Sequence, residues 1–215
     1  MSGGSEETLW SGSLADFCEA TASGAPTPGG GSVAGVCGTL GMGLVIMALE
    51  ISVKRKDAVE PERTKGLIEK GRGVMKELRG DADADVRAFR AYMAALKLPK
   101  ETEEEKQARR EAMEGASRGA TEAPLLAARH MVEGLRLADA AVSLTHAHVL
   151  SDVGAGAGLM EGALKAVLFN VDVNLPSLGD LELRRAMGEE RAGLAREGGE
   201  VAAMVLGKVA ERFAR

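Results

Sequence analysis

Aromatic residues are scarce in this sequence of 215 residues. One Trp, one Tyr and four Phe are present, which is too few for an aromatic-rich β-sandwich or for a surface that stacks nucleic-acid bases. Basic residues are not in excess either, because 27 Lys and Arg stand against 32 Asp and Glu. A net charge of −5 provides no electrostatic footprint for DNA, RNA or an anionic membrane. We therefore expect the partner to be a small molecule or another protein, with no nucleic acid and no membrane involved.

Cysteine is nearly absent, since Cys18 and Cys37 are the only two. They are too few and too widely spaced for a disulfide framework or a zinc site, and their apolar neighbours predict reduced, buried thiols. The first residues carry Glu6 and Glu7 where a signal peptide would have basic residues and an apolar run. We therefore expect a cytoplasmic protein. With 45% hydrophobic residues, residues 1–215 suffice for one domain, in which 1–12 are expected to be flexible.

Sustained alternation of apolar and polar residues is missing too, whereas helical spacing recurs, as at Leu67, Val74 and Leu78. This predicts an all-α, single-domain bundle of about seven or eight helices. Residues with known preferences at helix ends set the boundaries. We expect a helix to open at Pro61 and one to end at Pro99, a cap at Thr102, a start or kink at Pro124 and a break at Pro176.

Charged side chains are absent from residues 20–49. Residues 33–49 approach the length of a membrane span, but a buried central helix is favoured because the segment is rich in glycine and charges follow immediately. Gly35, Gly38 and Gly41 recur at helical spacing. Such a stripe predicts close helix packing, either within the chain or across a dimer axis.

A Pro/Gly segment, Pro-Thr-Pro-Gly-Gly-Gly-Ser over residues 26–32, precedes this helix. Free N–H groups at such a loop, together with the positive end of the helix dipole, can hold a carboxylate or phosphate. The alternative is a simple turn before a helix that Ser32 caps. No preceding strand and no following Lys are present, so neither a dinucleotide fingerprint nor a Walker loop is indicated.

Three carboxylates stand close together at Asp81, Asp83 and Asp85. On a helix the first and third share a face, and Asp83 lies nearer the opposite one. The pattern fits a solvated surface, but in an apolar cleft such crowding raises the pKa of a carboxyl group toward the range used in acid–base catalysis. The spacing does not fit a calcium loop, and we expect no metal site.

Asparagines and histidines gather later in the sequence. Asn170 and Asn174 are four apart near a helix end, where amides serve either as caps or as partners for a heterocycle such as a pterin. His146 and His148 form an H-x-H pair, which is more typical of solvated histidines than of zinc ligands without a third ligand. His130 is expected to have a packing or surface role.

Six of these segments together resemble the C-terminal family of formiminotransferase-cyclodeaminases. They are PTPGGGSVAG, DADVRAF, ALKLPKETEEEKQARREAM, APLLAA, SDVGAGA and NVDVNL, in this order across residues 14–213. The resemblance implies an all-helical homodimer acting on a small-molecule folate in one-carbon metabolism, with a tetrahydrofolate derivative as substrate and no tightly bound cofactor. Family members are formimidoyltetrahydrofolate cyclodeaminases or methenyltetrahydrofolate cyclohydrolases.

The resemblance also implies roles for single residues. By the D-x-x-A-F spacing it places the catalytic aspartate at Asp85, with Asp83 as a neighbour that assists it. The loop residues Gly29, Gly30, Gly31 and Ser32 are expected near the folate. Asp152, Asn170 and Asn174 are expected to face either the pterin or the dimer partner.

A basic run in the family would meet the carboxylates of the folate tail, which is polyglutamylated in some substrates. In this sequence the corresponding residues are Lys54 and Lys56, without the usual flanking Gly and Tyr. A second departure is the His146–His148 segment, where a Gly-Asn turn is common. The cyclodeaminase reaction is slightly favoured by the family name, with the cyclohydrolase reaction second. A helical scaffold without catalytic activity is the third interpretation.

Overall fold

The computed structural model describes residues 8–214, and within them the chain forms six α-helices, three short 3-10 helices and no strand. Their bounds are η1 (Leu9–Ser11), α1 (Leu14–Ala22), α2 (Gly30–Val53), α3 (Pro61–Leu96), α4 (Glu103–Val142), η2 (Ala147–Val149), α5 (Leu150–Asn174), η3 (Leu175–Ser177) and α6 (Leu181–Phe213). The predicted all-α architecture is confirmed, with six α-helices in the described residues in place of seven or eight.

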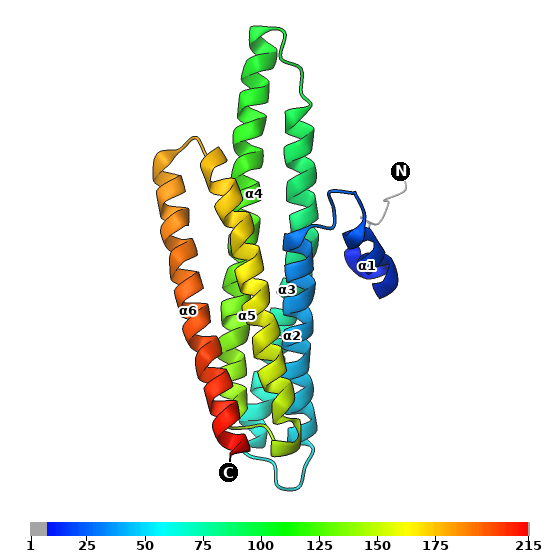
Figure 1. Cartoon of the computed structure of the whole chain (residues 1–215), viewed down its shortest axis with the longest axis vertical. Helices are drawn as coiled ribbons and strands as arrows, with labels where there is room; N and C mark the ends of the chain where they lie inside the picture. The colour runs from blue at the N-terminus through cyan, green and yellow to red at the C-terminus, as the bar shows by residue number, and fades with distance from the viewer. Residues whose placement is uncertain (1–7, 215) are drawn as a thin grey trace.

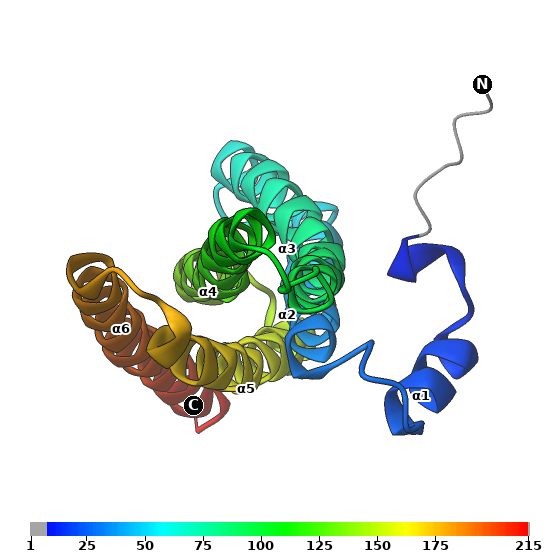
Figure 2. The same cartoon turned by 90° about the horizontal axis from the view of Figure 1, so that it is seen from above.

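The five long helices, α2 to α6, lie side by side along the long axis of the molecule (Figure 1). Helix α2 packs mainly against α3 and α5, while α4 packs against α3, α5 and α6. Seen from above, α6 covers the outer side of α4 and α5, and α1 stands apart from the bundle (Figure 2). The hairpin of α3 and α4 extends beyond the other helices at one end (Figure 1).

Helix α2 is the central apolar helix that the uncharged segment predicted. By length and hydropathy alone it would qualify as a membrane span, with a mean hydropathy of 2.0 over its best window. Within the bundle 61% of that window is buried. This burial against α3 and α5 is what a core helix requires, because an apolar surface on all sides must be covered by neighbours.

Glycines on α2 permit the close packing of its neighbours. A Cβ on Gly35 would come within 2.8 Å of the Ala82 Cβ on α3, and a Cβ on Gly41 would come within 2.8 Å of the Gly156 carbonyl oxygen on α5. The predicted stripe therefore acts within the chain. These contacts bring the backbones of α3 and α5 so near to α2 that any side chain would force the helices apart.

The expected start or kink at Pro124 does not divide α4, which continues as one helix from Glu103 to Val142. Proline has no N–H, so the carbonyl of Ala120, four residues earlier, loses its usual helical donor. The Asn174 side chain of α5 replaces that donor, because its Nδ2 donates a hydrogen bond to the Ala120 oxygen at 2.6 Å. A contact between distant parts of the sequence thus satisfies the carbonyl that the proline leaves free.

Helix ends follow the predicted residues at α3 and α4. Pro61 opens α3, and Thr102 caps α4 through a hydrogen bond from the Glu105 N–H. The cap assigned to Ser32 was wrong, because α2 begins at Gly30 with Gly29 as its N-cap. Ser32 is the third residue of α2, and its hydroxyl bonds to a carboxylate on α3 instead.

The N-terminal region differs from expectation in two ways. Residues 1–7 of the predicted flexible segment lie outside the described residues, but Thr8 and Leu9 bind Asp83 of α3 through hydrogen bonds of 2.6 and 2.9 Å. Cys18 is exposed and Cys37 is half-buried, so the prediction of two buried thiols was wrong. The physical reason at Cys18 is that α1 makes few contacts with the rest of the chain.

A polar pair holds α3 against α4 inside the bundle. Asp81 is buried at 7% exposure, and its Oδ2 lies 2.7 Å from His130 Nδ1. The hydrogen bond to this carboxylate raises the pKa of His130, while burial opposes the rise; Glu77 adds to it and Arg129 counteracts it. The pair fixes α3 one helical turn before Asp85.

We expect Gly41→Ala to destabilise the fold, because the new methyl group would collide with the α5 backbone. The free energy of unfolding should fall by about 1–3 kcal/mol in chemical denaturation. Gly73→Ala on the exposed face of α3 is the control, since nothing lies within 4 Å of a Cβ there. It should be neutral or stabilising by up to about 1 kcal/mol, because alanine favours helices. Equal effects of both variants would contradict the packing described for α2.

We expect the Asp81–His130 pair to make stability depend on pH. Because the folded pKa of His130 lies above the unfolded value near 6.5, its contribution is fully present below pH 6.5 and is lost as pH rises through the folded pKa. His130→Gln should therefore lower the free energy of unfolding most at acidic pH, by about 1–3 kcal/mol. Chemical denaturation of the wild type and of His130→Gln at several pH values measures the difference in the free energy of unfolding. His148→Gln is the control, and a pH-independent difference for His130→Gln would refute the prediction.

Candidate active site

Asp85 on α3 is tied to the first turn of α2 through one of its two oxygens. Its Oδ2 accepts hydrogen bonds from the Ser32 N–H at 2.9 Å and from the Ser32 hydroxyl at 2.8 Å. Ser32 is fully buried. The N–H is one of those left unpaired at a helix N-terminus, where the helix dipole favours a negative group. The carboxylate is thus fixed in position by the loop and helix start that the Pro/Gly segment builds.

The other oxygen, Oδ1, lies against Gly31, next to the side-chain amide of Asn170. A Cβ on Gly31 would collide with the Asp85 carboxylate and lie 2.9 Å from Asn170 Nδ2. Only glycine therefore permits this arrangement at position 31. Among residues 8–214, no hydrogen-bond donor is recorded for Asp85 Oδ1.

Asn170 on α5 completes this group. Its Nδ2 is buried and has no hydrogen-bond partner in the described residues, and a Cβ on Gly30 would lie 3.9 Å from its Oδ1. A buried N–H without a partner costs about 1–3 kcal/mol, so such groups are rare in folded proteins, and Arg109 Nε on α4 is the other one among residues 8–214. The chain therefore brings together a carboxylate with one free oxygen and an amide with a free donor, which suits proton transfer to a polar ligand.

Asp83 does not share this space with Asp85. Both of its oxygens accept hydrogen bonds from the N-terminal segment, at Thr8 and Leu9. The two aspartates are two residues apart, so their side chains leave α3 on different faces. Asp83 thus anchors residues 8–9, and the structure offers no contact through which it would assist Asp85.

Asn174 is also committed elsewhere, because its Nδ2 donates to the Ala120 carbonyl next to Pro124. The two asparagines that the sequence paired on one helix face therefore differ in their availability. Asn170 has a free donor beside Asp85, while Asn174 joins α5 to α4.

The remaining predicted residues lie at the opposite end of the bundle. At about 1.5 Å of rise per residue, Lys54 at the end of α2 stands roughly 34 Å from Gly31, and Asp152 stands roughly 27 Å from Asn170 along α5. Lys54 and Lys56 are exposed. One chain thus does not bring Lys54, Lys56 or Asp152 to Asp85.

The two histidines of the H-x-H pair share that far end. Their rings form an edge-to-face contact with centroids 4.8 Å apart, and the His146 N–H donates to the Ser52 hydroxyl at 2.8 Å. In residues 8–214 no group of three or more His, Cys, Asp or Glu side chains is placed to hold a metal ion.

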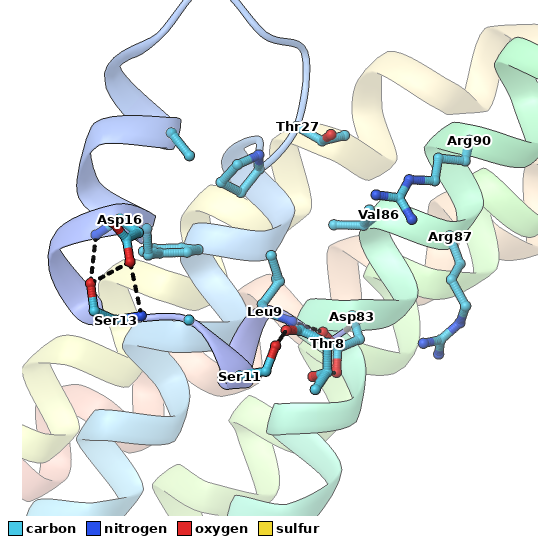
Figure 3. Close-up of a pocket in the computed structure, with 14 residues that line it drawn as sticks. Thr8, Leu9, Ser11, Ser13, Asp16, Thr27, Asp83, Val86, Arg87 and Arg90 are labelled. Carbon is cyan, nitrogen blue, oxygen red and sulfur yellow. Dashed lines mark hydrogen bonds between the residues drawn. The ribbon is translucent and has the colours of Figure 1, made fainter. Parts of the chain in front are cut away.

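A cavity of about 520 Å³ lies between α1 and α3, on the face of α3 that carries Asp83 (Figure 3). Arg87 and Arg90 line its α3 side, and Thr27 and Pro28 contribute from the loop before α2. Sequence reasoning did not single out these arginines. The sequence does place both arginines within one and a half helical turns after Asp85, which could have marked them as candidates.

The sequence is similar to those of known proteins. Residues 13–193 match the family model described as Formiminotransferase-cyclodeaminase. A methenyltetrahydrofolate cyclohydrolase from Methylorubrum extorquens is 38% identical over 176 residues, which cover 81% of this chain and 83% of that protein. A formimidoyltransferase-cyclodeaminase from Rattus norvegicus is 30% identical over 97% of this chain, which spans only 39% of that longer protein.

A solved structure shares the fold. The crystal structure titled formiminotetrahydrofolate cyclodeaminase from Thermotoga maritima superposes with a TM-score of 0.83, covering 94% of this chain and 97% of that one at 24% identity. At this identity the likeness establishes the architecture alone. The family match over most of the chain and the 38% identity to the bacterial relative show that the chain belongs to the Formiminotransferase-cyclodeaminase family.

Proposed function

We propose that this protein is a folate one-carbon enzyme in which Asp85 moves protons on and off the atoms around the bridging carbon. The observation that carries this proposal is the asymmetry of the Asp85 carboxylate. Ser32 holds Oδ2 through two hydrogen bonds, and Oδ1 is left facing Gly31 and the free amide of Asn170. A general base needs this combination of fixed orientation and one available oxygen.

Of the two reactions in the family, we place methenyltetrahydrofolate cyclohydrolase first. The relative that bears this name has a length similar to this chain and the higher identity of those compared. In this reaction water attacks the carbon that bridges N5 and N10 of the folate. Asp85 Oδ1 takes one proton from that water as the C–O bond forms, which gives a tetrahedral carbon bearing a hydroxyl group.

The second half of the reaction returns the proton. As the hydroxyl proton leaves to solvent and the C–O bond becomes a carbonyl, the bond from carbon to N5 breaks, and N5 takes the proton from Asp85. The product is the 10-formyl compound, and one proton is released overall. Asn170 Nδ2 is positioned to donate to an oxygen or ring nitrogen of the substrate beside Asp85.

Cyclodeamination is the second candidate, because the vertebrate relatives that align over nearly the whole chain are named for it. Here N10 attacks the formimidoyl carbon attached to N5, and Asp85 takes the proton from N10. The formimidoyl group enters this step protonated, as an amidinium, so the tetrahedral carbon carries an NH2 group. That group takes the proton that Asp85 returns and leaves as ammonia, while the carbon becomes the cationic methenyl bridge. Both reactions use the same carboxylate in the same order, base first and acid second.

The proposal includes a homodimer, supported by apolar side chains that the chain leaves uncovered on α2 and α5. Leu40, Met47 and Ile51 are exposed on α2, and Phe169 and Val173 on α5 are 66% and 77% exposed. A second copy would cover such a surface. Lys54, Lys56 and Asp152 can take part in the reaction only if a second copy carries them to Asp85. A polyglutamylated substrate also remains part of the proposal.

A scaffold without activity is the weaker alternative. Such a protein would have no reason to keep the Asn170 donor buried and unpartnered next to a carboxylate. Loss of both folate binding and turnover in the purified protein would favour the scaffold.

We expect Asp85→Asn to fold and bind folate but to lose about 10²–10⁴-fold in kcat, because the amide cannot accept the proton. Steady-state kinetics and thermal denaturation measure activity and folding separately. Asp139→Asn is the control, a half-buried carboxylate on α4 that pairs with Lys208 and lies outside this site. Asp83→Asn should reduce kcat far less than Asp85→Asn, since Asp83 faces the N-terminal segment. An undiminished rate in Asp85→Asn would end the assignment.

The choice between the two reactions is made by supplying each folate separately. We expect the absorbance of 5,10-methenyltetrahydrofolate to disappear without ammonium when the cyclohydrolase proposal holds. Release of ammonium from 5-formimidoyltetrahydrofolate, with appearance of the methenyl compound, would instead assign the cyclodeaminase. The Asp85→Asn protein serves as the blank in both assays.

A further inference from the structure

We infer that the cavity between α1 and α3 binds the anionic glutamyl tail of the folate, and that Arg87 and Arg90 recognise its carboxylates. This inference rests on the proposed function, since it concerns a different part of the same substrate. It replaces Lys54 and Lys56 as the tail site within one chain, because those residues stand at the far end of α2.

The first support is the charge of the cavity wall. Arg87 and Arg90 both line it, and neither forms an ion pair within 4.0 Å among residues 8–214, whereas Arg118, Arg129, Arg136, Arg185 and Arg191 on α4 and α6 do. Being three residues apart on α3, they project from one face with Cβ atoms about 5–6 Å apart. This spacing suits a ligand with two carboxylates, such as a glutamate.

The acidic residues of the same cavity are already satisfied. Asp83 accepts hydrogen bonds from Thr8 and Leu9, and Asp16 accepts them from Ser13, which lowers the pKa of Asp16. Neither acid contacts an arginine in the described residues. The guanidinium groups are therefore the part of the wall with donors still available to an anion (Figure 3).

The second support is the apolar lining. Leu9, Phe17, Pro28 and Val86 all border the cavity. In a folate an aminobenzoyl ring joins N10 to the glutamate, so an apolar stretch is needed between the reacting carbon and the anionic end. Aromatic and aliphatic side chains provide that surface.

The third support is the distance to Asp85. Pro28 at the cavity edge and Gly31 beside Asp85 are three residues apart, which limits their separation to about 10 Å. Asp85 and the cavity lie on different faces of α3, and Gly29 and Gly30 are the two residues between Pro28 and Gly31. These residues carry no side chain there, so an elongated ligand can pass over the backbone from one face to the other. Besides allowing the contact between Gly31 and Asp85, the three glycines thus leave room for the ligand.

The test compares two substrates and two charge-removing variants. One substrate is the folate adduct with its glutamate, and the other is the same adduct of tetrahydropteroate, which lacks the glutamate. With the full substrate, Arg87→Gln/Arg90→Gln should raise KM about 10–100-fold, with kcat changed less than about threefold. With the truncated substrate the wild type should already show the raised KM, and the variant should add nothing.

Three further measurements locate the effect. Lys70→Gln/Lys76→Gln removes the same charge from exposed positions of α3 and should leave both KM values unchanged. Arg87→Lys/Arg90→Lys keeps the charge and should recover part of the affinity. The tail fragment p-aminobenzoylglutamate should inhibit the wild type competitively and lose its effect on the Gln variant.

The outcomes separate the two proposals. If the wild type turns over neither folate, the proposed function fails and this inference fails with it. If the wild type is active but the Gln variant keeps the wild-type KM and its inhibition by p-aminobenzoylglutamate, only the tail site is refuted. The tail site is also refuted if Lys54→Gln/Lys56→Gln raises the KM of the full substrate and Arg87→Gln/Arg90→Gln does not.

Discussion

The close approach of α3 and α5 to the glycine face of α2 is the constraint on which the rest of the structure depends. Gly31 and Gly35 both face α3, and Gly41 faces α5 at the level of Gly156. A single stripe of missing side chains therefore packs the core and opens the space in which Asp85 meets Ser32. Packing and site are not separable here, because any residue larger than glycine at position 31 would displace the carboxylate as well as the helix.

Local signals in the sequence predicted the helical class and several helix ends. Pro61 and Thr102 define helix ends through residues next to them in the sequence, so a short stretch of sequence is enough to predict their roles. The helix cap expected at Ser32 and the helix start considered at Pro124 were wrong, because the partners of these residues are distant in the sequence. The Ser32 hydroxyl bonds to Asp85, and the carbonyl that Pro124 leaves free bonds to Asn174. Local preference cannot reveal a partner that only the fold supplies.

The candidate site could be predicted only in part from the sequence. The features that depend on neighbouring residues were predictable, and those that depend on contacts between distant residues were not. The motif spacing indicated Asp85 and the triple glycine, and the structure places them in contact. It did not reveal that Asp83 faces the N-terminal segment, because this depends on where residues 8–9 lie. Nor did it reveal that α2 and α5 run antiparallel, which sends Lys54 and Asp152 to one end and Asn170 to the other. The order of motifs along a chain does not determine which of them meet in space.

The asymmetry of the Asp85 carboxylate bears on why one family can hold two reactions. Ser32 fixes the orientation of Asp85 through contacts within the chain, so the proton acceptor that we propose is in place whether the attacking atom is a water oxygen or N10. What must differ is the group that leaves the tetrahedral carbon, N5 in one case and an exocyclic nitrogen in the other. The Asn170 donor, which is buried and without a partner among residues 8–214, lies next to Gly31. Under the proposed mechanism, selectivity between the reactions would reside in the contacts of Asn170, and Asp85 would supply the proton transfers that both reactions share.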